Sequence, residues 1–192
     1  MSKKALTLIS ISAFLLVIGS GCLENEDEKN QLAIIDTSEG TIKIKLFEDK
    51  LPITTENFIK LATDGFYDGL IFHRVKDDFM IQAGRYTPDG SQKTSPYGTI
   101  EFETHPDVQH VDGAISMARG TDLNSASAEF FICDGAQHLL DEQYAAFGVV
   151  IEGLEVVEEI ASTPHDESLE PSPGGGKPLE DIIINSITIE TQ

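Results

Sequence analysis

Hydrophobic and polar positions alternate near the start of the region that follows residue 30. Residues 32–35 are a short apolar run, and residues 41–46 alternate isoleucine or leucine with threonine or lysine. Alternation with a period of two is typical of a strand with one buried face. The turn-forming residues 38–40 lie between the two segments. We therefore expect a β-hairpin at the start of the folded part.

Two later segments carry the three-to-four-residue spacing of an amphipathic helix. The first follows Pro52 and has Phe58, Leu61 and Ala62 on one stripe, and the second covers residues 154–161. Short strands with turn signals between them are predicted at residues 70–75, 79–83, 99–102, 114–118, 130–132, 147–151 and 182–189. About eight short strands and two helices predict a mainly β fold, a closed eight-stranded antiparallel β-barrel capped by two α-helices. If side chains fill the barrel, a binding site must lie on its outside.

Charge and composition narrow the classes of partner. The chain has 33 acidic and 13 basic residues and a net charge of -20. Such a surface repels phosphate backbones, so we do not expect a nucleic-acid partner. The five histidines show no metal-ligand spacing, and we assign neither a metal nor a cofactor.

The first 21 residues have the pattern of an export signal. Two lysines precede a mostly apolar run, and small residues then lead to Cys22. A cysteine directly after small residues resembles a lipobox, in which Cys22 would be lipidated and become the first mature residue. Gly19 stands where that pattern prefers leucine. We expect a lipoprotein held on the outer face of a membrane.

Two alternatives to lipidation stay open. Ordinary signal-peptide cleavage would give a secreted protein, and an uncleaved apolar run at residues 5–23 would be just long enough to span a bilayer. All three readings place the folded part outside the cytoplasm, because the lysines stay inside. The expected organisation is a signal peptide at 1–21, an anchor cysteine with an acidic linker at 22–30, and one domain at 31–192.

The stretch from Phe72 to Gly84 carries the most informative polar residues. Arg74 lies in a run that otherwise has the pattern of a buried strand, where a charge needs a partner or a task. On the next predicted strand, Met80 and Gln82 share a face. An apolar floor with hydrogen-bond donors at its rim is typical of a groove for a small ligand. Taken singly, Arg74 would also suit a structural ion pair, and Met80 would suit the core.

This stretch resembles the cyclophilin signature, F-H-R-[VI]-x-x-x-F-M-x-Q-x-G. Further motifs agree in order: ENF at 56–58, GAISMA at 113–118, SASAEFFI at 125–132, LD at 140–141 and FGVV at 147–150. The resemblance covers about residues 31–190. It implies an eight-stranded barrel with two capping helices, an external groove for X-Pro, and peptidyl-prolyl cis/trans isomerase activity.

Carried over position by position, the resemblance makes Arg74 the catalytic arginine. Four apolar side chains would line the proline pocket, and polar groups at its rim would hold the peptide chain. The residues expected to bind substrate are Phe79, Met80, Gln82, Ala118, Arg119, Glu129, Phe131, Leu140 and Tyr144. Tyr144 stands where many members of the family have histidine.

Glu129 departs from the motif, in which glutamine is usual. A carboxylate lacks the two donors of an amide and adds a negative charge beside the groove. We expect Glu129 to pair with Arg74 or with Arg119. Pairing with Arg74 would weaken catalysis, and Glu129→Gln would then raise turnover. Arg85 also departs from the pattern, in a position where an acidic residue is common.

The resemblance leaves two classes of function. The first is a monomeric foldase that accelerates X-Pro rotation in exported or envelope proteins, with proline-containing polypeptides as partners. The second is a proline-peptide binding module or chaperone with low turnover. Because Arg74, Phe79 and Phe131 are all present, the sequence favours the enzyme.

Overall fold

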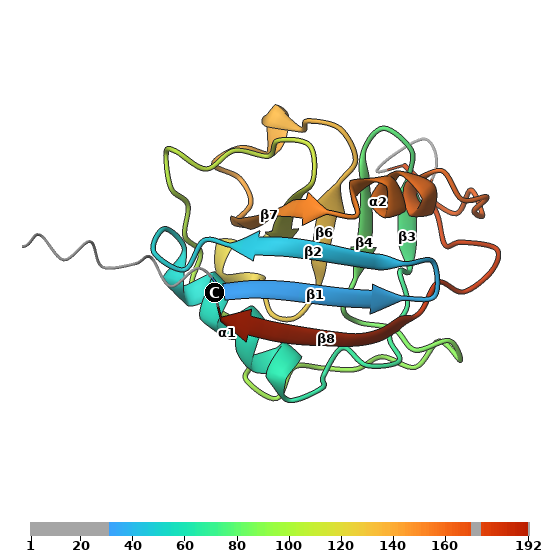
Figure 1. The fold of residues 1–192 in the computed structure, drawn as a ribbon, viewed down its shortest axis with the longest axis horizontal. Helices are drawn as coiled ribbons and strands as arrows, with labels where there is room; N and C mark the ends of the chain where they lie inside the picture. Colours follow the sequence, from blue (N-terminus) through green and yellow to red (C-terminus); the bar gives the residue numbers. More distant parts are fainter. Residues whose placement is uncertain (1–30, 170–173, 192) are drawn as a thin grey trace, which may run out of the picture.

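The strands form one antiparallel sheet in the structure, a computed structural model that describes residues 31–169 and 174–191. The sheet order is β3-β4-β6-β5-β7-β2-β1-β8, and the sheet curls around its own core (Figure 1). The eight strands of the described residues are β1 (Gln31–Thr37), β2 (Thr41–Leu46), β3 (Arg74–Lys76), β4 (Met80–Ala83), β5 (Ala114–Met117), β6 (Phe130–Cys133), β7 (Ala146–Glu152) and β8 (Ile184–Thr191).

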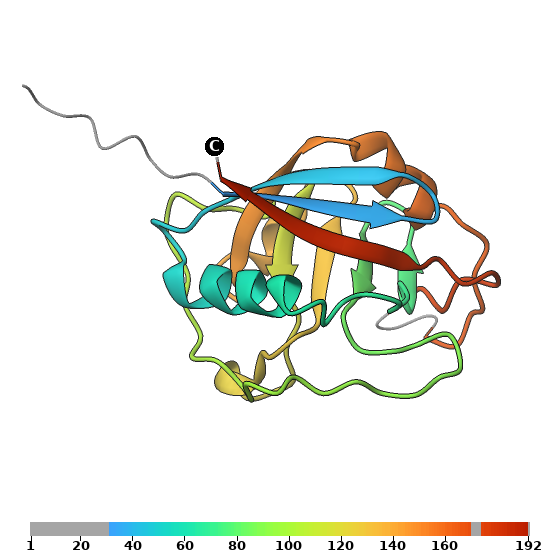
Figure 2. The same ribbon diagram turned by 60° about the horizontal axis from the view of Figure 1, so that its bottom comes forward.

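The two predicted helices are present. Helix α1 (Pro52–Thr63) begins at a proline, which suits the first helical turn because no intrahelical partner exists there for its nitrogen. It packs against β8, whereas α2 (Leu154–Ala161) packs against β2, β3 and β4. Figures 1 and 2 show the two helices on opposite sides of the curled sheet. Two short 3₁₀ turns, η1 (Leu123–Ser125) and η2 (His138–Leu140), lie in the loops beside β6.

Two expectations about the strands need correction. Residues 99–102 form no strand, and within residues 70–75 only the last two belong to β3. The sheet is a curled, open one: β3 and β8 end the strand order and are not laddered to each other. An isolated bridge between Ile71 and Ile183 links the chain just outside these strands. The closure predicted from the sequence is therefore not confirmed, because the chain before β3 runs as turns and irregular backbone.

The core inside the curl is built around four aromatic rings. Phe58 of α1 contacts Tyr67, Phe130 and Phe147 with ring centroids 5.1 to 5.5 Å apart. The hydroxyl of Tyr67 is fully buried and donates to the carbonyl oxygen of Ala128 at 3.1 Å. This hydrogen bond offsets the cost of burying the hydroxyl. It also links the turn that follows α1 to the segment that precedes β6.

Strands β4, β5 and β6 are buried on both faces, which decides where a site can form. Side chains such as Ile81, Ile115 and Ile132 point into the core. Their neighbours in sequence point outward and form a second, smaller apolar cluster, made of Met80, Ala114, Phe131 and Cys133 with Phe79, Ala118, Leu140 and Tyr144 packed against it. The outer face of the sheet thus carries a preformed apolar surface.

Candidate active site

A cavity of about 190 Å³ opens on this outer apolar cluster. Nine of the ten residues predicted from the sequence line it: Arg74, Phe79, Met80, Gln82, Ala118, Arg119, Phe131, Leu140 and Tyr144. They come from β3, the β3–β4 turn, β4, the loop after β5, β6, and η2 with the loop that follows it. The tenth, Glu129, borders the adjoining hollow. The structure brings the predicted set together, and substrate binding by these residues stays a prediction.

Buried apolar side chains form the floor of the cavity, and an aromatic ring forms one wall. Phe131 and Met80 form the floor and are 5% and 2% exposed. The ring of Tyr144 stands edge-on to Phe131, with centroids 5.8 Å apart. Arg119 lies over the Tyr144 ring at 4.8 Å and donates to the carbonyl oxygen of Gln143 at 2.9 Å. These contacts fix the position of the Tyr144 ring beside the cavity, which we call the proline slot.

Arg74 is positioned by its strand and by a distant loop. Across the β3–β4 ladder it is the direct partner of Gln82, so the two side chains lie next to each other. Its guanidinium carbon lies 5.7 Å from the centre of the Phe79 ring. Its Nε and Nη2 donate to the carbonyl oxygen of Gly174 at 3.0 and 2.9 Å. Sequence reasoning missed Gly174, which lies 100 residues away and acts through its backbone.

The loop at residues 174–176 lies against β3 because its residues are glycines. Val75 donates to the carbonyl oxygen of Gly176 at 2.9 Å, and Gly176 donates back at 3.2 Å. Gly175 has φ +80°, and a Cβ there would lie 2.3 Å from the Val75 carbonyl oxygen. A larger residue would need both a strained backbone and a displaced loop. The glycines therefore place the carbonyl that orients Arg74.

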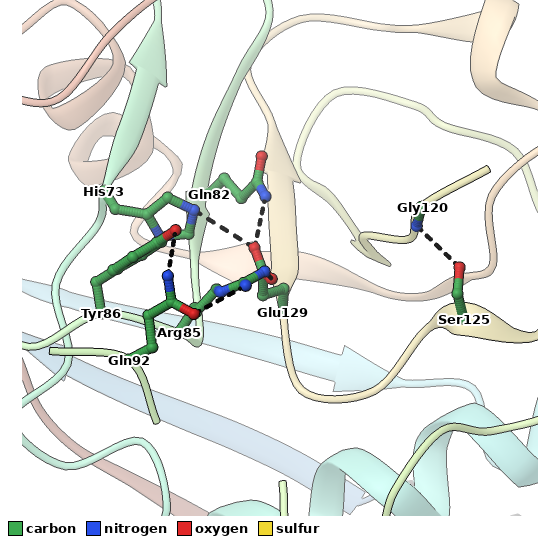
Figure 3. Close-up of polar contacts among 8 residues, drawn as sticks. All are labelled: His73, Gln82, Arg85, Tyr86, Gln92, Gly120, Ser125 and Glu129. Carbon is green, nitrogen blue, oxygen red and sulfur yellow. Dashed lines mark hydrogen bonds and ion pairs between the residues drawn. The ribbon is translucent and has the colours of Figure 1, made fainter. Parts of the chain in front are cut away.

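The expected partners of Glu129 were wrong. Its Oε1 accepts from Nη1 of Arg85 at 2.8 Å, and its Oε2 lies 3.5 Å from Nε2 of His73 and 3.2 Å from Nε2 of Gln82 (Figure 3). The β4–β6 register pairs Ala83 with Phe130, which brings the residues that follow β4 beside the one that precedes β6. Burial acts to raise the pKa of Glu129, but hydrogen bonds from His73 and Arg85 outweigh it and hold this pKa below its ordinary value. The negative charge is thus neutralised away from Arg74.

A second hollow of about 610 Å³ continues from the cavity past Glu129. The two share Gln82, Ala118 and Arg119, so a single extended chain could pass from one to the other. On the far side of this hollow, the Ser125 hydroxyl accepts from the backbone of Gly120 at 2.9 Å and shapes the loop (Figure 3).

The described residues hold neither a metal-binding cluster nor a membrane-spanning helix. No set of three or more His, Cys, Asp or Glu side chains there is arranged to hold a metal ion. None of the helices in residues 31–169 and 174–191 combines the length and apolarity needed to cross a membrane. The expected signal, the lipidated Cys22 and the acidic linker lie outside the described residues.

Comparison with known proteins gives a consistent result. The family model "Cyclophilin type peptidyl-prolyl cis-trans isomerase/CLD" matches residues 32–189. The chain is 32% identical to peptidyl-prolyl cis-trans isomerase A of Dickeya dadantii over 199 aligned residues, covering 98% of each chain. It is 38% identical to human peptidyl-prolyl cis-trans isomerase-like 3, covering 81% of this chain and 93% of that one. A crystal structure of a cyclophilin type isomerase from Cryptosporidium parvum, in the presence of the dipeptide Ala-Pro, superposes with a TM-score of 0.71 at 27% identity, covering 84% of this chain and 99% of that one.

Proposed function

The chain belongs to the cyclophilin-type peptidyl-prolyl cis-trans isomerase family and is an isomerase of that kind, and we propose that Arg74 and the outer apolar cavity carry its catalysis. In this mechanism the cavity holds the proline ring, and the guanidinium stabilises the X-Pro amide when it is twisted. The observation that carries the proposal is the meeting of Arg74 with Phe79, Met80 and Phe131 around one slot.

Isomerisation needs no nucleophile, general base or metal, because no bond breaks. The barrier of about 18–20 kcal/mol comes from the partial double bond of the amide. For X-Pro bonds the uncatalysed rotation takes tens to hundreds of seconds. A protein accelerates it by binding the twisted amide more tightly than the planar one. In the twisted state the prolyl nitrogen becomes pyramidal and regains a lone pair, which an N–H donor can then bind.

The geometry of Arg74 suits that role. Its guanidinium is held by the Gly174 carbonyl and packed near Phe79, so it need not reorganise during rotation. A guanidinium is always charged and presents its donors in a rigid fork, unlike the flexible ammonium of lysine. Its interaction with the prolyl nitrogen exists only in the twisted state, and this difference is what lowers the barrier.

The rest of the cavity would bind both ground state and transition state. Phe131 and Met80 offer an apolar floor for the proline ring, and Gln82 offers a polar side chain beside Arg74. The N–H of Ala118 already donates to the Glu129 carbonyl at 2.9 Å, so the peptide would be held there by the carbonyl oxygen of Ala118 instead. The solved relative studied with Ala-Pro supports a proline-containing peptide as the ligand class.

A control variant makes the assay specific. We expect Arg74→Ala to lower turnover of a proline peptide in a protease-coupled assay about 100- to 1,000-fold, the loss typical of one preorganised donor. Lys43→Ala removes one positive charge from β2, outside the cavity, where the ammonium lies 3.5 Å from Glu152, and is expected to keep turnover within about threefold, because an exposed ion pair contributes little. Equal turnover by wild type and Arg74→Ala would overturn the mechanism. A folded wild type that binds the peptide without accelerating its rotation would favour the binding module.

The place of action is a separate proposal. An exported foldase, anchored through lipidated Cys22 and acting on exported or envelope proteins, is supported by the two lysines, the apolar run and the small residues before Cys22. The mass of the native N-terminus tests it. A mature chain beginning at a lipid-modified Cys22 is expected, whereas an unmodified or uncleaved N-terminus would contradict the lipid anchor.

A further inference from the structure

A buried hydroxyl lies beneath the floor of the cavity. Ser116 is in the middle of β5 and is 0% exposed. In the β5–β6 ladder it is the direct partner of Phe131, so its side chain lies next to that ring on the outer face of the sheet. A buried hydroxyl in an apolar cluster is costly unless it has a hydrogen-bond partner. Its partner is Nε2 of His110, at 3.0 Å.

His110 links this hydroxyl to a carboxylate on another segment. Its Nδ1 lies 2.9 Å from Oδ1 of Asp141, and its backbone N–H donates to the same oxygen at 2.6 Å. An ionised carboxylate only accepts, so Nδ1 carries the proton and Nε2 accepts from Ser116. Burial lowers the pKa of His110, and the hydrogen bond to Asp141 opposes this shift only in part. Because the net shift is downward from 6.5, the ring is mainly neutral near pH 7. The direction of both hydrogen bonds is therefore fixed.

The Asp141–His110–Ser116 chain has the order of groups found in serine hydrolases, yet it is not built for nucleophilic attack. Ser116 lies beside Phe131 in the ladder and has no exposed surface. A nucleophile must reach a reacting atom at about 3–3.5 Å. The arrangement therefore has a different use.

The three residues instead connect the parts that shape the proline slot. The His110 ring lies parallel to the Phe131 ring within 11°, with centroids 6.0 Å apart. Asp141 directly follows Leu140, which lines the cavity, and the backbone N–H of Tyr144 donates to the Leu140 carbonyl at 3.1 Å. A shift of His110 would thus move the floor and the wall relative to each other.

We propose that His110 is a positioning residue for the proline slot. By joining Ser116 to Asp141 it holds Phe131 at a fixed separation from Leu140 and Tyr144, which matches the slot to the proline ring. The inference rests on the proposed function, because it takes this slot as the site of the substrate proline. His110 would affect how tightly the slot binds the proline ring and not how Arg74 acts on the amide. Replacing His110 should therefore change the affinity for a proline peptide more than the turnover.

The variant His110→Phe keeps a ring against Phe131 and removes both hydrogen bonds. The buried hydroxyl of Ser116 then lacks its partner, while Asp141 keeps the backbone N–H of residue 110 and the contact with His138 but is no longer joined to Ser116. We expect the dissociation constant of a proline peptide, followed by NMR titration, to rise about tenfold, while turnover at saturation falls less than about threefold, because uniform binding is what is lost. The double variant with Ser116→Ala should recover part of the affinity, since removing both partners is less costly than removing one.

His138→Phe is the matched control. His138 also contacts Asp141, at 3.0 Å, but its side chain is 56% exposed and it is not paired with Ser116. This variant should keep the wild-type dissociation constant within about twofold, as expected for an exposed pair. If His110→Phe does not fold, Ser116→Ala alone gives the same test, with an expected weakening of at least about threefold.

An unchanged dissociation constant in a folded His110→Phe or Ser116→Ala variant overturns the inference, and so does an equal loss in His138→Phe. A wild-type ring of His110 protonated at Nε2 in a nitrogen-detected NMR spectrum would also overturn it. Because affinity is measured without turnover, these outcomes differ from failure of the proposed function, which would show as no acceleration by the wild type.

Discussion

Replacing Glu129 by glutamine tests whether this carboxylate weakens catalysis by pairing with Arg74 or stabilises the fold by pairing with Arg85. The change removes the negative charge that pairs with Arg85 and keeps an oxygen that can accept from Gln82. From the sequence, pairing with Arg74 predicted a rise in turnover after this substitution. The structure places the carboxylate on Arg85 and His73 instead, so we now expect a loss of stability and unchanged catalysis.

The size of the effect follows from the geometry. The distance of 2.8 Å between Nη1 of Arg85 and Oε1 of Glu129 is that of a charge-assisted hydrogen bond, which contributes about 1.5–3 kcal/mol when shielded. The side chain of Arg85 is 43% exposed, however, and solvent screening reduces the coupling to about 1 kcal/mol. Urea unfolding of wild type, Glu129→Gln, Arg85→Ala and the double variant measures this coupling as a double-mutant cycle.

Turnover of the same four proteins completes the test. We expect Glu129→Gln to stay within about threefold of the wild type, because its charge is neutralised outside the cavity. A clear rise in turnover would refute this reasoning and would show that the carboxylate weakens Arg74. A coupling below about 0.3 kcal/mol, the level at which independent sites add, would refute the ion pair.

Three further predictions concern the loop, the buried histidine and the free cysteine. Gly175→Ala should lower turnover about tenfold by displacing the carbonyl that orients Arg74; Gly90→Ala, with a similar φ and open space around it, controls for backbone strain and should not. Because the folded-state pKa of His110 lies below its ordinary 6.5, the unfolded chain takes up a proton first as the pH falls. The free energy of unfolding should therefore decrease below about pH 6.5 in urea titrations, and His110→Phe should flatten that decrease; an unchanged slope would contradict it. Burial raises the pKa of Cys133 to about 12, so a thiol reagent at pH 8 should label it only after unfolding, and fast labelling of the native protein would count against its burial.

Local periodicity predicted the two helices and the strand β2 well. The alternation in β2 and the stripe of α1 follow from having one face buried, and the structure shows that pattern. In β4, β5 and β6 both faces are buried, so periodicity could not tell the core side from the cavity side. The assignment of Phe131 to the cavity came from the family motif and not from the spacing of apolar residues.

Contacts between segments that are far apart in the chain could not be predicted from the sequence. The carbonyl of Gly174 reaches Arg74 across 100 residues, and no side-chain pattern marks it. The partner of Glu129 depended on the β4–β6 register, which places Arg85 beside it. Residues 99–102 have the composition of a strand but pair with no neighbouring strand. Ile100 donates to the Ala126 carbonyl, and the backbone of Phe102 donates to the side chain of Asn124.

The central claim is that the guanidinium of Arg74 binds the twisted X-Pro amide better than the flat one. NMR exchange on a proline peptide with wild type and Arg74→Lys gives both the rotation rate of the bound peptide and its dissociation constant. The account predicts a rate about 100-fold lower in the variant with affinity within about threefold, because lysine keeps the charge and loses the rigid fork. A loss of affinity as large as the loss of rate, or an unchanged rate, would contradict it.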